Sequence, residues 1–393
     1  MAIYILSGAR TPSGSFMGEL STVPAPKLGG VAIAGALARA DGAKNSATWE
    51  TLVDEVYMGN ALQAGVGQAP ARQAALAAGL PNSVPCTTIN KVCGSGLKAI
   101  ICGAQSILAG DNKLVIAGGM ENMSLSPHLL ANSRVGHKFG NSEMKDAMLW
   151  DGLWDVYSQR PMGSCAEECA AKYDISRETQ DDYAIESFKR AQNAANKGYF
   201  AAEIVPVTLS GKRGASQVIS KDEGPFKANF AKIPQLPPAF AKDGSITAAN
   251  ASTINDGAAA VFLAGEDYKE QAKFKILAYA SHAHGPTWFT TAPIMAIQKV
   301  LEKAQLKIED IDLFEVNEAF SLVSMIAMKE LKLDYNKVNI YGGAVSLGHP
   351  IGASGTRIIV TLMHAMERES ARYGLAAICI GGGEALSMII ERI

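Results

Sequence analysis

CGSGLKAIICGAQSILAGDNKLVIAGGME, residues 93–121, is the stretch of sequence that decides the fold. It starts with a glycine-rich turn and continues with apolar residues at helical spacing, which Gly110 and Asp111 are placed to end. A short apolar run at 114–117 then has the pattern of a buried strand. The same alternation of helical and strand patterns elsewhere in the chain predicts an α/β fold.

The pattern of residues 93–121 occurs again near the C-terminus. Residues 352–355 (Gly-Ala-Ser-Gly) precede a second apolar helix, a strand over 376–380 and then residues 381–384 (Gly-Gly-Gly-Glu), with similar spacing. Glycine-rich turns are common in α/β proteins, so chance similarity is the alternative explanation. A duplicated α/β half accounts for both copies.

The length of the chain, 393 residues, indicates more than one domain-sized unit. Residues 124–249 are richer in polar residues and prolines than the rest and contain one clear helical pattern, at 177–196. We interpret them as an inserted loop subdomain. The first half then comprises residues 1–123 plus 250–270, and the second half comprises residues 271–393.

The composition indicates a soluble globular protein, with 48% hydrophobic residues, 19% charged residues and a formal net charge of -2. This net charge gives no indication that the protein binds nucleic acid or an anionic membrane. Residues 1–6 have the pattern of a buried strand ending at Ser7 and Gly8, not of a signal peptide, and no apolar run has the length of a membrane span. The last residues do not form a peroxisomal targeting signal, so we expect a cytoplasmic protein.

The six cysteines include no Cys-x-x-Cys pair, which argues against a disulfide framework or a zinc site. His282 and His284 have no carboxylate or thiol nearby in the sequence. We therefore assign no metal.

Cys93 lies in a turn just before a predicted helix, between Asn90 and Gly96. Helix-terminal N–H groups favour an anion, so we expect a lowered pKa for this thiol and a role as nucleophile. Gly94 and Gly96 are expected to leave room for a substrate. For a cysteine taken alone, a buried inert thiol is the common alternative.

Three further segments contain residues suited to catalysis. His349, at the equivalent turn of the second copy, suits a base or an oxyanion donor, although a loop histidine is the simpler explanation. Cys379 precedes three glycines whose N–H groups can hold an oxyanion. The alternative explanation for this cysteine is a buried residue at the end of a strand. Asn317 offers an amide for a ligand or water, or a helix N-cap.

Together these segments resemble the thiolase family over nearly the whole chain, most closely its acetyl-CoA acetyltransferases, the acetoacetyl-CoA thiolases. The resemblance rests on the order and spacing of several motifs: Ala9-Arg10-Thr11-Pro12 and residues 65–73, 90–96, 118–124, 255–259, 317–320, 348–355 and 379–383. It implies a thiolase fold, with two βαβαβαββ halves in αβαβα layers and an inserted loop subdomain that holds coenzyme A.

The resemblance also implies a ping-pong acyl transfer that joins two acetyl-CoA into acetoacetyl-CoA and coenzyme A. Cys93 would carry the acetyl group after activation by His349, and Cys379 would act as acid and base. His349 and a water on Asn317 would stabilise the enolate. The N–H groups of Cys93 and Gly381 would form a second oxyanion hole. No cofactor beyond the coenzyme A substrates is implied, and relatives are homodimers or homotetramers.

Substrate contacts follow from the same resemblance. Ser252 matches a pantetheine-contacting serine, and Met162 and Phe240 match residues near the acyl pocket. Lys212, Arg213, Lys221 and Lys227 are candidates for the nucleotide phosphates or for solvated loop positions. One departure is Pro161, which stands where short-chain biosynthetic thiolases commonly have histidine, and it leaves the acyl-length preference open.

Other functions fit parts of this pattern. Within the family, the alternative is a broader-range degradative 3-ketoacyl-CoA thiolase. A ketoacyl synthase or hydroxymethylglutaryl-CoA synthase lacks the second cysteine in Cys-x-Gly-Gly-Gly. A Cys-His-Asn hydrolase leaves Cys379 unexplained. A non-catalytic acyl-CoA-binding protein is expected to lack catalytic groups that this chain has.

Overall fold

The computed structural model describes residues 2–40, 49–210 and 216–393. The elements of the first half are β1 (Ile3–Arg10), β2 (Gly14–Ser15), α1 (Ala25–Arg39), β3 (Glu55–Gly59), α2 (Pro70–Ala77), β4 (Cys86–Ile89), α3 (Ser95–Ala109), β5 (Leu114–Asn122) and β12 (Asn255–Ala264). Those of the second half are β13 (Phe274–Ala283), α6 (Ala292–Ala304), β14 (Leu313–Val316), α7 (Ser321–Leu331), α8 (Ala344–Leu347), α9 (Ile351–Arg368), β15 (Tyr373–Ile380) and β16 (Glu384–Arg392).

The two halves have the same strand order, which confirms the predicted duplication. The first half runs β1-β12-β5-β3-β4 and the second runs β13-β16-β15-β14. A parallel bridge between Phe314 and Val338 stands where β4 pairs with β3 in the first half. The halves are joined edge to edge, because β1 pairs antiparallel with β13 at Ile3 to Ile5 as well as with β12.

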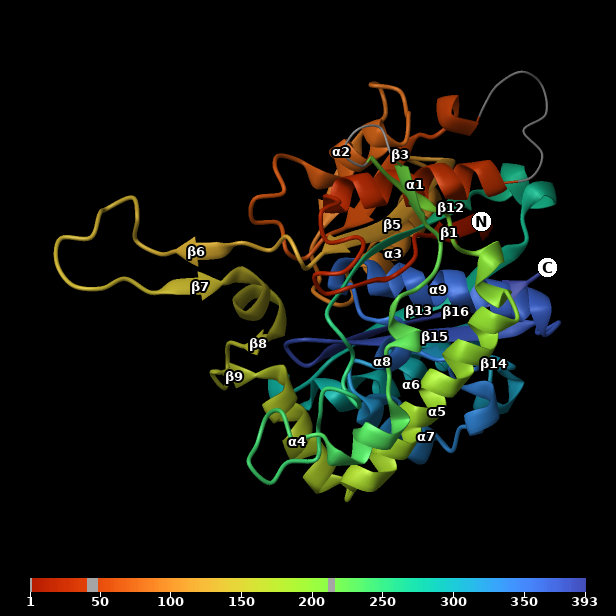
Figure 1. Ribbon diagram of the computed structural model, residues 1–393. Helices are drawn as coiled ribbons and strands as arrows, with labels where there is room; N and C mark the ends of the chain where they lie inside the picture. The colour runs from red at the N-terminus through yellow and green to blue at the C-terminus, as the bar shows by residue number, and fades with distance from the viewer. Residues whose placement is uncertain (1, 41–48, 211–215) are drawn as a thin grey trace.

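The helices form three layers around the two half-sheets (Figure 1). Helices α1 and α2 cover the outer face of the first half, and α6 and α7 cover the outer face of the second half. Helices α3 and α9 lie between the half-sheets, and their apolar faces pack in one core with strands of both halves. The predicted αβαβα order is therefore confirmed.

Glycines allow the first turns of the two central helices to touch. A Cβ on Gly96 would lie 2.8 Å from the backbone nitrogen of Thr356, and one on Gly355 would lie 2.4 Å from the backbone nitrogen of Leu97. A Cβ on Gly94 would meet the side chain of Ile380 at 2.4 Å. Gly94 and Gly96 thus make room for the second half, so the prediction that they make room for a substrate was wrong.

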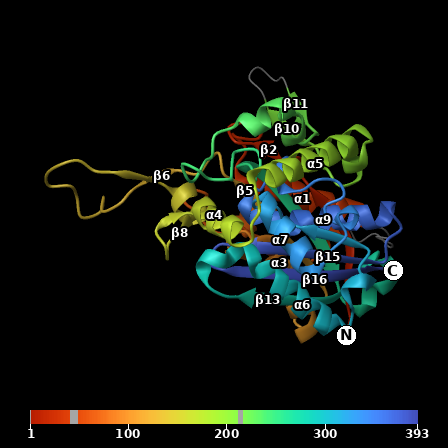
Figure 2. The same ribbon diagram turned by 90° about the horizontal axis from the view of Figure 1, so that it is seen from below.

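The segment between the halves contains more regular structure than predicted. Helix α5 (Arg177–Asn196) has the predicted bounds, whereas α4 (Met162–Lys172) was missed. A hairpin of β6 (His128–Leu130) and β7 (Met144–Asp146) projects from the body in both views (Figures 1 and 2). The remaining strands pair as β8 (Trp154–Asp155) with β9 (Arg160–Pro161) and β10 (Val207–Ser210) with β11 (Ser216–Ile219).

Short helical segments complete the chain. One is a π-helical turn at Leu149–Leu153, and the 3₁₀ segments are Trp49–Thr51, Tyr199–Ala202, Gly224–Phe226, Phe230–Gln235, Glu266–Gln271, Pro286–Thr291, Ile308–Asp310 and Tyr335–Lys337.

Three expectations from the sequence differ from the structure. Strand β1 continues past Ser7 and Gly8 to Arg10, because its pairing with β12 extends that far. Gly118 and Gly119 lie inside β5 rather than after it. Val92–Ala109 has a mean hydropathy of 1.4 and the length of a membrane span, contrary to expectation, but 61% of it is buried inside the protein, as fits the central core helix α3.

Candidate active site

The predicted catalytic turns meet at one cavity of about 700 Å³ between the halves and the inserted segment. Seven of the eight predicted site residues line it: Cys93, His349, Cys379, Gly381, Ser252, Met162 and Phe240. Its wall is mostly apolar, as expected for a site that holds an acyl chain and a pantetheine arm.

The turn before α3 fixes the position of Cys93. The Ser95 hydroxyl donates to the carbonyl of Val92 at 2.7 Å and accepts from the backbone N–H of Lys91 at 2.8 Å. Val92 adopts a left-handed backbone with φ 47°, which is unfavourable for a β-branched residue. Such strain at a catalytic turn is typical of functional sites.

The prediction of a lowered pKa for Cys93 was wrong. Burial and, to a smaller extent, the charge of Glu121 raise the pKa of this thiol to about 11. The backbone N–H groups of Gly381 and of Cys93 itself hydrogen-bond to the sulfur and oppose this rise without cancelling it. The thiol is therefore protonated near neutral pH, and its activation requires a proton acceptor.

His349 lines the same cavity, and a neutral imidazole is chemically suited to accept a proton. Its ring is buried, and burial, together with the charge of Arg357, lowers its pKa to about 3, so it is neutral near pH 7. Nδ1 lies 2.6 Å from the Ser354 hydroxyl, while Nε2 has no hydrogen-bond partner among the described residues. The backbone N–H of His349 donates to Oδ1 of Asn255 at 3.1 Å.

Cys379 is the second thiol of the cavity. It lies near the end of β15, and its pKa is raised well above the ordinary value by burial and then by the charge of Cys93. Cys93 and Cys379 line the same cavity. Beyond Cys379, Gly382 and Gly383 have φ values of 91° and 85°, which let the loop bend so that the Gly381 N–H reaches the Cys93 sulfur.

Asn317 lies just after β14 and is fully buried. Neither polar atom of its side chain has a partner within the described part of the chain, although its backbone N–H donates to Ala377 at 2.9 Å. An unpaired buried amide is costly, so it indicates a site that expects a polar ligand or water. The N-cap alternative was wrong, because α7 begins only at Ser321.

The predicted substrate contacts come from the inserted segment and the loop before β12. Met162 begins α4, and Phe240 packs edge-on against Phe320, with ring centroids 6.2 Å apart. The backbone N–H of Ser252 donates to Ala319 at 3.0 Å. These contacts tie Phe240 and Ser252 to the loop that follows Asn317.

Two of the four basic candidates for the phosphates lie in the described part of the chain. Lys227 lines the cavity and is paired with Glu223 at 2.7 Å, whereas Lys221 is solvent-exposed. Lys212 and Arg213 lie outside the described residues. Where residues are described, no group of three or more His, Cys, Asp or Glu side chains is arranged to hold a metal ion.

Comparison with known proteins identifies the family. Residues 3–267 match the thiolase N-terminal domain, and residues 270–392 match the thiolase C-terminal domain. The chain belongs to the thiolase family. It is 50% identical to acetyl-CoA acetyltransferase 2 of Arabidopsis thaliana, with 99% of this chain and 96% of that protein aligned. It is 49% identical to the mitochondrial acetyl-CoA acetyltransferase of Rattus norvegicus, over 100% and 91% of the two chains.

The solved structure of the Acat5 thiolase of Ascaris suum in complex with coenzyme A has the same fold. Its TM-score with this thiolase is 0.93 at 44% identity, and each chain is covered completely. The predicted thiolase fold is thus confirmed. Family membership also favours the thiolase interpretation over the hydrolase and the related condensing enzymes.

Sequence reasoning missed Glu121, a buried carboxylate of this thiolase. It accepts hydrogen bonds from the side-chain amide of Asn60 at 2.6 Å and from the backbone N–H groups of Ala61, Leu62 and Gly352 at 2.9, 3.2 and 2.9 Å. Burial raises its pKa to about 7. A Cβ on Gly119 would meet the carbonyl oxygen of Gly352 at 2.0 Å, so the glycines within β5 permit this close approach.

Glu384 is the equivalent glutamate of the second copy, and it contacts the first half. It forms an ion pair with Lys91 in the Cys93 turn. Each half therefore contributes a glutamate to the catalytic turn of the other. Glu121 and Glu384 occupy matching positions in the sequence repeat. This match was the signal that each contacts the catalytic turn of the other half.

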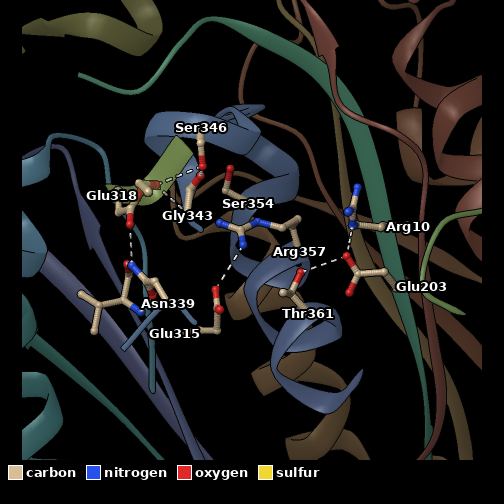
Figure 3. Close-up of polar contacts among 12 residues, drawn as sticks. Arg10, Glu203, Glu315, Glu318, Asn339, Gly343, Ser346, Ser354, Arg357 and Thr361 are labelled. Carbon is tan, nitrogen blue, oxygen red and sulfur yellow. Dashed lines mark hydrogen bonds and ion pairs between the residues drawn. The ribbon is translucent and has the colours of Figure 1, made fainter. Parts of the chain in front are cut away.

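A buried polar layer supports the His349 and Asn317 loops of the thiolase (Figure 3). Arg357 pairs with Glu315 at 3.2 Å beneath the site. Glu318 accepts from Tyr183 on α5 at 2.8 Å and from the backbone N–H of Val345 at 3.1 Å. Because charged groups this deep are costly unless paired, the layer fixes how α5, α8 and α9 meet.

Proposed function

We propose that this thiolase is an acetyl-CoA C-acetyltransferase, which joins two acetyl-CoA reversibly into acetoacetyl-CoA and coenzyme A. The observation that carries the proposal is the convergence of two thiols, a neutral imidazole and the Gly381 N–H on one cavity. The full-length similarity to proteins named acetyl-CoA acetyltransferase supports the choice of substrate.

In the first step, Cys93 takes an acetyl group from acetyl-CoA. Its proton passes to Nε2 of His349 as the sulfur attacks the thioester, and the departing coenzyme A thiolate receives that proton. The negative oxygen of the tetrahedral intermediate is held by the N–H groups of Cys93 and Gly381, which in the free protein hydrogen-bond to the sulfur. Losing one such donor typically costs about 3 to 4 kcal/mol.

In the second step, Cys379 removes the α-proton of a second acetyl-CoA. Burial raises the pKa of Cys379, so its thiolate is the minor form near neutral pH, and this thiolate is the form that acts as the base. The enolate oxygen is held by His349 and by a water on Asn317. Attack of the enolate carbon on acetyl-Cys93 forms acetoacetyl-CoA, and the Cys93 thiolate released takes up the proton from Cys379.

The inserted segment holds the substrates. Ser252 contacts the pantetheine arm, and Met162 and Phe240 border the acetyl group, as their place on the cavity wall supports. Lys227, also on that wall, is the most direct candidate for a phosphate contact. No cofactor is required, because the thioester itself supplies the activated acyl group.

A broader-range 3-ketoacyl-CoA thiolase is the second candidate. The apolar wall formed by Leu149, Phe289 and Phe320, together with Pro161 in place of histidine, favours it. Thiolysis of a series of 3-ketoacyl-CoA substrates separates the two. A kcat/KM that falls steeply beyond acetoacetyl-CoA supports the short-chain function, and a flat or rising series overturns it.

The active form is proposed to be a homodimer or homotetramer in the cytoplasm. Exposed apolar side chains on and beside the β6–β7 hairpin support self-association: Leu130, Val135, Phe139 and Met144. Light scattering of the purified protein tests the assembly. Because relatives such as the rat protein are named mitochondrial, cell fractionation is the test of location.

A further inference from the structure

The proposed function makes two demands on one nitrogen atom. Nε2 of His349 must accept the Cys93 proton in the first step and present an N–H to the enolate oxygen in the second. A neutral imidazole has one ring proton, so the second state requires a bare Nδ1. Whatever contacts Nδ1 must therefore suit both tautomers.

Ser354 is that contact. Its hydroxyl is fully buried on the first turn of α9 and lies 2.6 Å from Nδ1 of His349 and 2.9 Å from the carbonyl oxygen of Pro350. The Pro350 carbonyl oxygen can only accept a hydrogen bond, whereas Nδ1 of His349 can donate or accept one. A hydroxyl has one proton and two lone pairs, and it can rotate to suit either arrangement.

Both tautomers leave the buried groups paired. With the proton on Nδ1, the ring donates to Ser354, which donates to Pro350. With the proton on Nε2, the hydroxyl turns and donates to Nδ1. The Pro350 carbonyl then still accepts from the backbone N–H groups of Ala353 at 2.9 Å and Ser354 at 3.0 Å.

We propose that Ser354 is a positioning residue whose hydroxyl, by rotating, keeps Nδ1 of His349 paired in both tautomers across the two half-reactions. The tautomer exchange itself takes one proton from Nδ1 and returns one to Nε2 by exchange with solvent water, so the ring stays neutral overall. The inference rests on the proposed function. A carboxylate at this position would only accept, and would hold the proton on Nδ1 throughout. The nearby positive charge of Arg357 favours exchange between neutral forms, because it disfavours a doubly protonated ring.

The direct test is nitrogen NMR of protein labelled at histidine, with His349→Asn identifying the resonances of residue 349. Free enzyme is compared with enzyme acetylated by acetyl-CoA. We expect the proton mainly on Nδ1 in the free enzyme and a shift toward Nε2 in the acetyl-enzyme. An unchanged tautomer in an enzyme shown to be acetylated overturns the inference while leaving the acetyltransferase proposal intact.

Variants extend the test to rates. Ser354→Ala is expected to slow both acetylation and condensation by about tenfold or more, with the KM for acetyl-CoA nearly unchanged. Ser354→Thr retains the hydroxyl and should recover most of both rates. Wild-type rates for both half-reactions in Ser354→Ala would overturn the inference.

Thr356→Val is the matched control. Thr356 is fully buried on the same helix, but its hydroxyl has no partner among the described residues. Its replacement should leave both rates and the tautomer shift intact. Loss of the tautomer shift in this folded variant would contradict the specific role of Ser354.

Discussion

Glu121, at the end of β5, accepts a hydrogen bond from the backbone N–H of Gly352 at 2.9 Å. A carboxylate of the first half thus holds the first turn of the helix that follows His349. The same carboxylate binds the loop at Asn60 to Leu62, and its charge acts on Cys93. Glu121 therefore links the position of His349 to that of Cys93.

Replacing Glu121 with Gln should lower both stability and the rate of acetylation. An amide places an NH₂ group against N–H donors, and each buried N–H left unpaired costs about 1 to 3 kcal/mol. We expect the free energy of unfolding to fall by that order and acetylation of Cys93 to slow. Denaturant unfolding and quenched-flow labelling measure the two effects. Glu384→Gln, at the more exposed equivalent site, is the control and should lose less stability.

Cys93→Ala should abolish covalent labelling by radioactive acetyl-CoA. The variant keeps the small apolar character of the position, so the fold should persist. Intact-protein mass spectrometry of wild type should show a single acetyl group, located by digestion at residue 93. Stoichiometric label in the variant would refute the assignment of the nucleophile.

Cys379→Ala should separate the half-reactions. Acetyl-Cys93 should still form, because its formation requires Cys93, His349 and the Gly381 N–H but not the second thiol. Condensation should become too slow to measure against wild type, since no group remains to remove the α-proton. Retained synthesis of acetoacetyl-CoA, followed by chromatography, would exclude the acid–base role of Cys379.

The fold and the catalytic turns follow from the sequence because both depend on local patterns. The repeat of glycine-rich turn, helix and strand predicted two equivalent halves, and it brought Cys93 and His349 together. The pKa of Cys93 was predicted with the wrong sign, because local position at a helix terminus says nothing of how deeply the second half buries the thiol. Ser354 and Glu121 were missed because their roles arise only when the turns of the two halves meet.

Stability should depend on pH through His349. Its folded-state pKa of about 3 lies below the ordinary value of 6.5, so the unfolded chain binds the proton more tightly. The stability linked to the neutral ring is present above pH 6.5 and is lost as the pH falls toward 3. In His349→Asn this contribution is absent. The stability difference between wild type and variant should therefore shrink from pH 7 to pH 5 in urea titrations, and a constant difference would contradict the lowered pKa.

Asn317→Leu should reduce condensation without a matching loss of stability. The side chain is fully buried, and no described residue pairs with either of its polar atoms, so an apolar side chain of similar volume breaks no hydrogen bond seen in the fold. The free energy of unfolding should change by about 1 kcal/mol or less.

Condensation should slow by about ten- to a hundredfold, because the enolate oxygen loses its water-mediated donor. Acetylation of Cys93 should proceed at nearly the wild-type rate, since Asn317 acts only on the second substrate. A variant that condenses normally would remove Asn317 from the mechanism, and one that unfolds would show that its amide is structural.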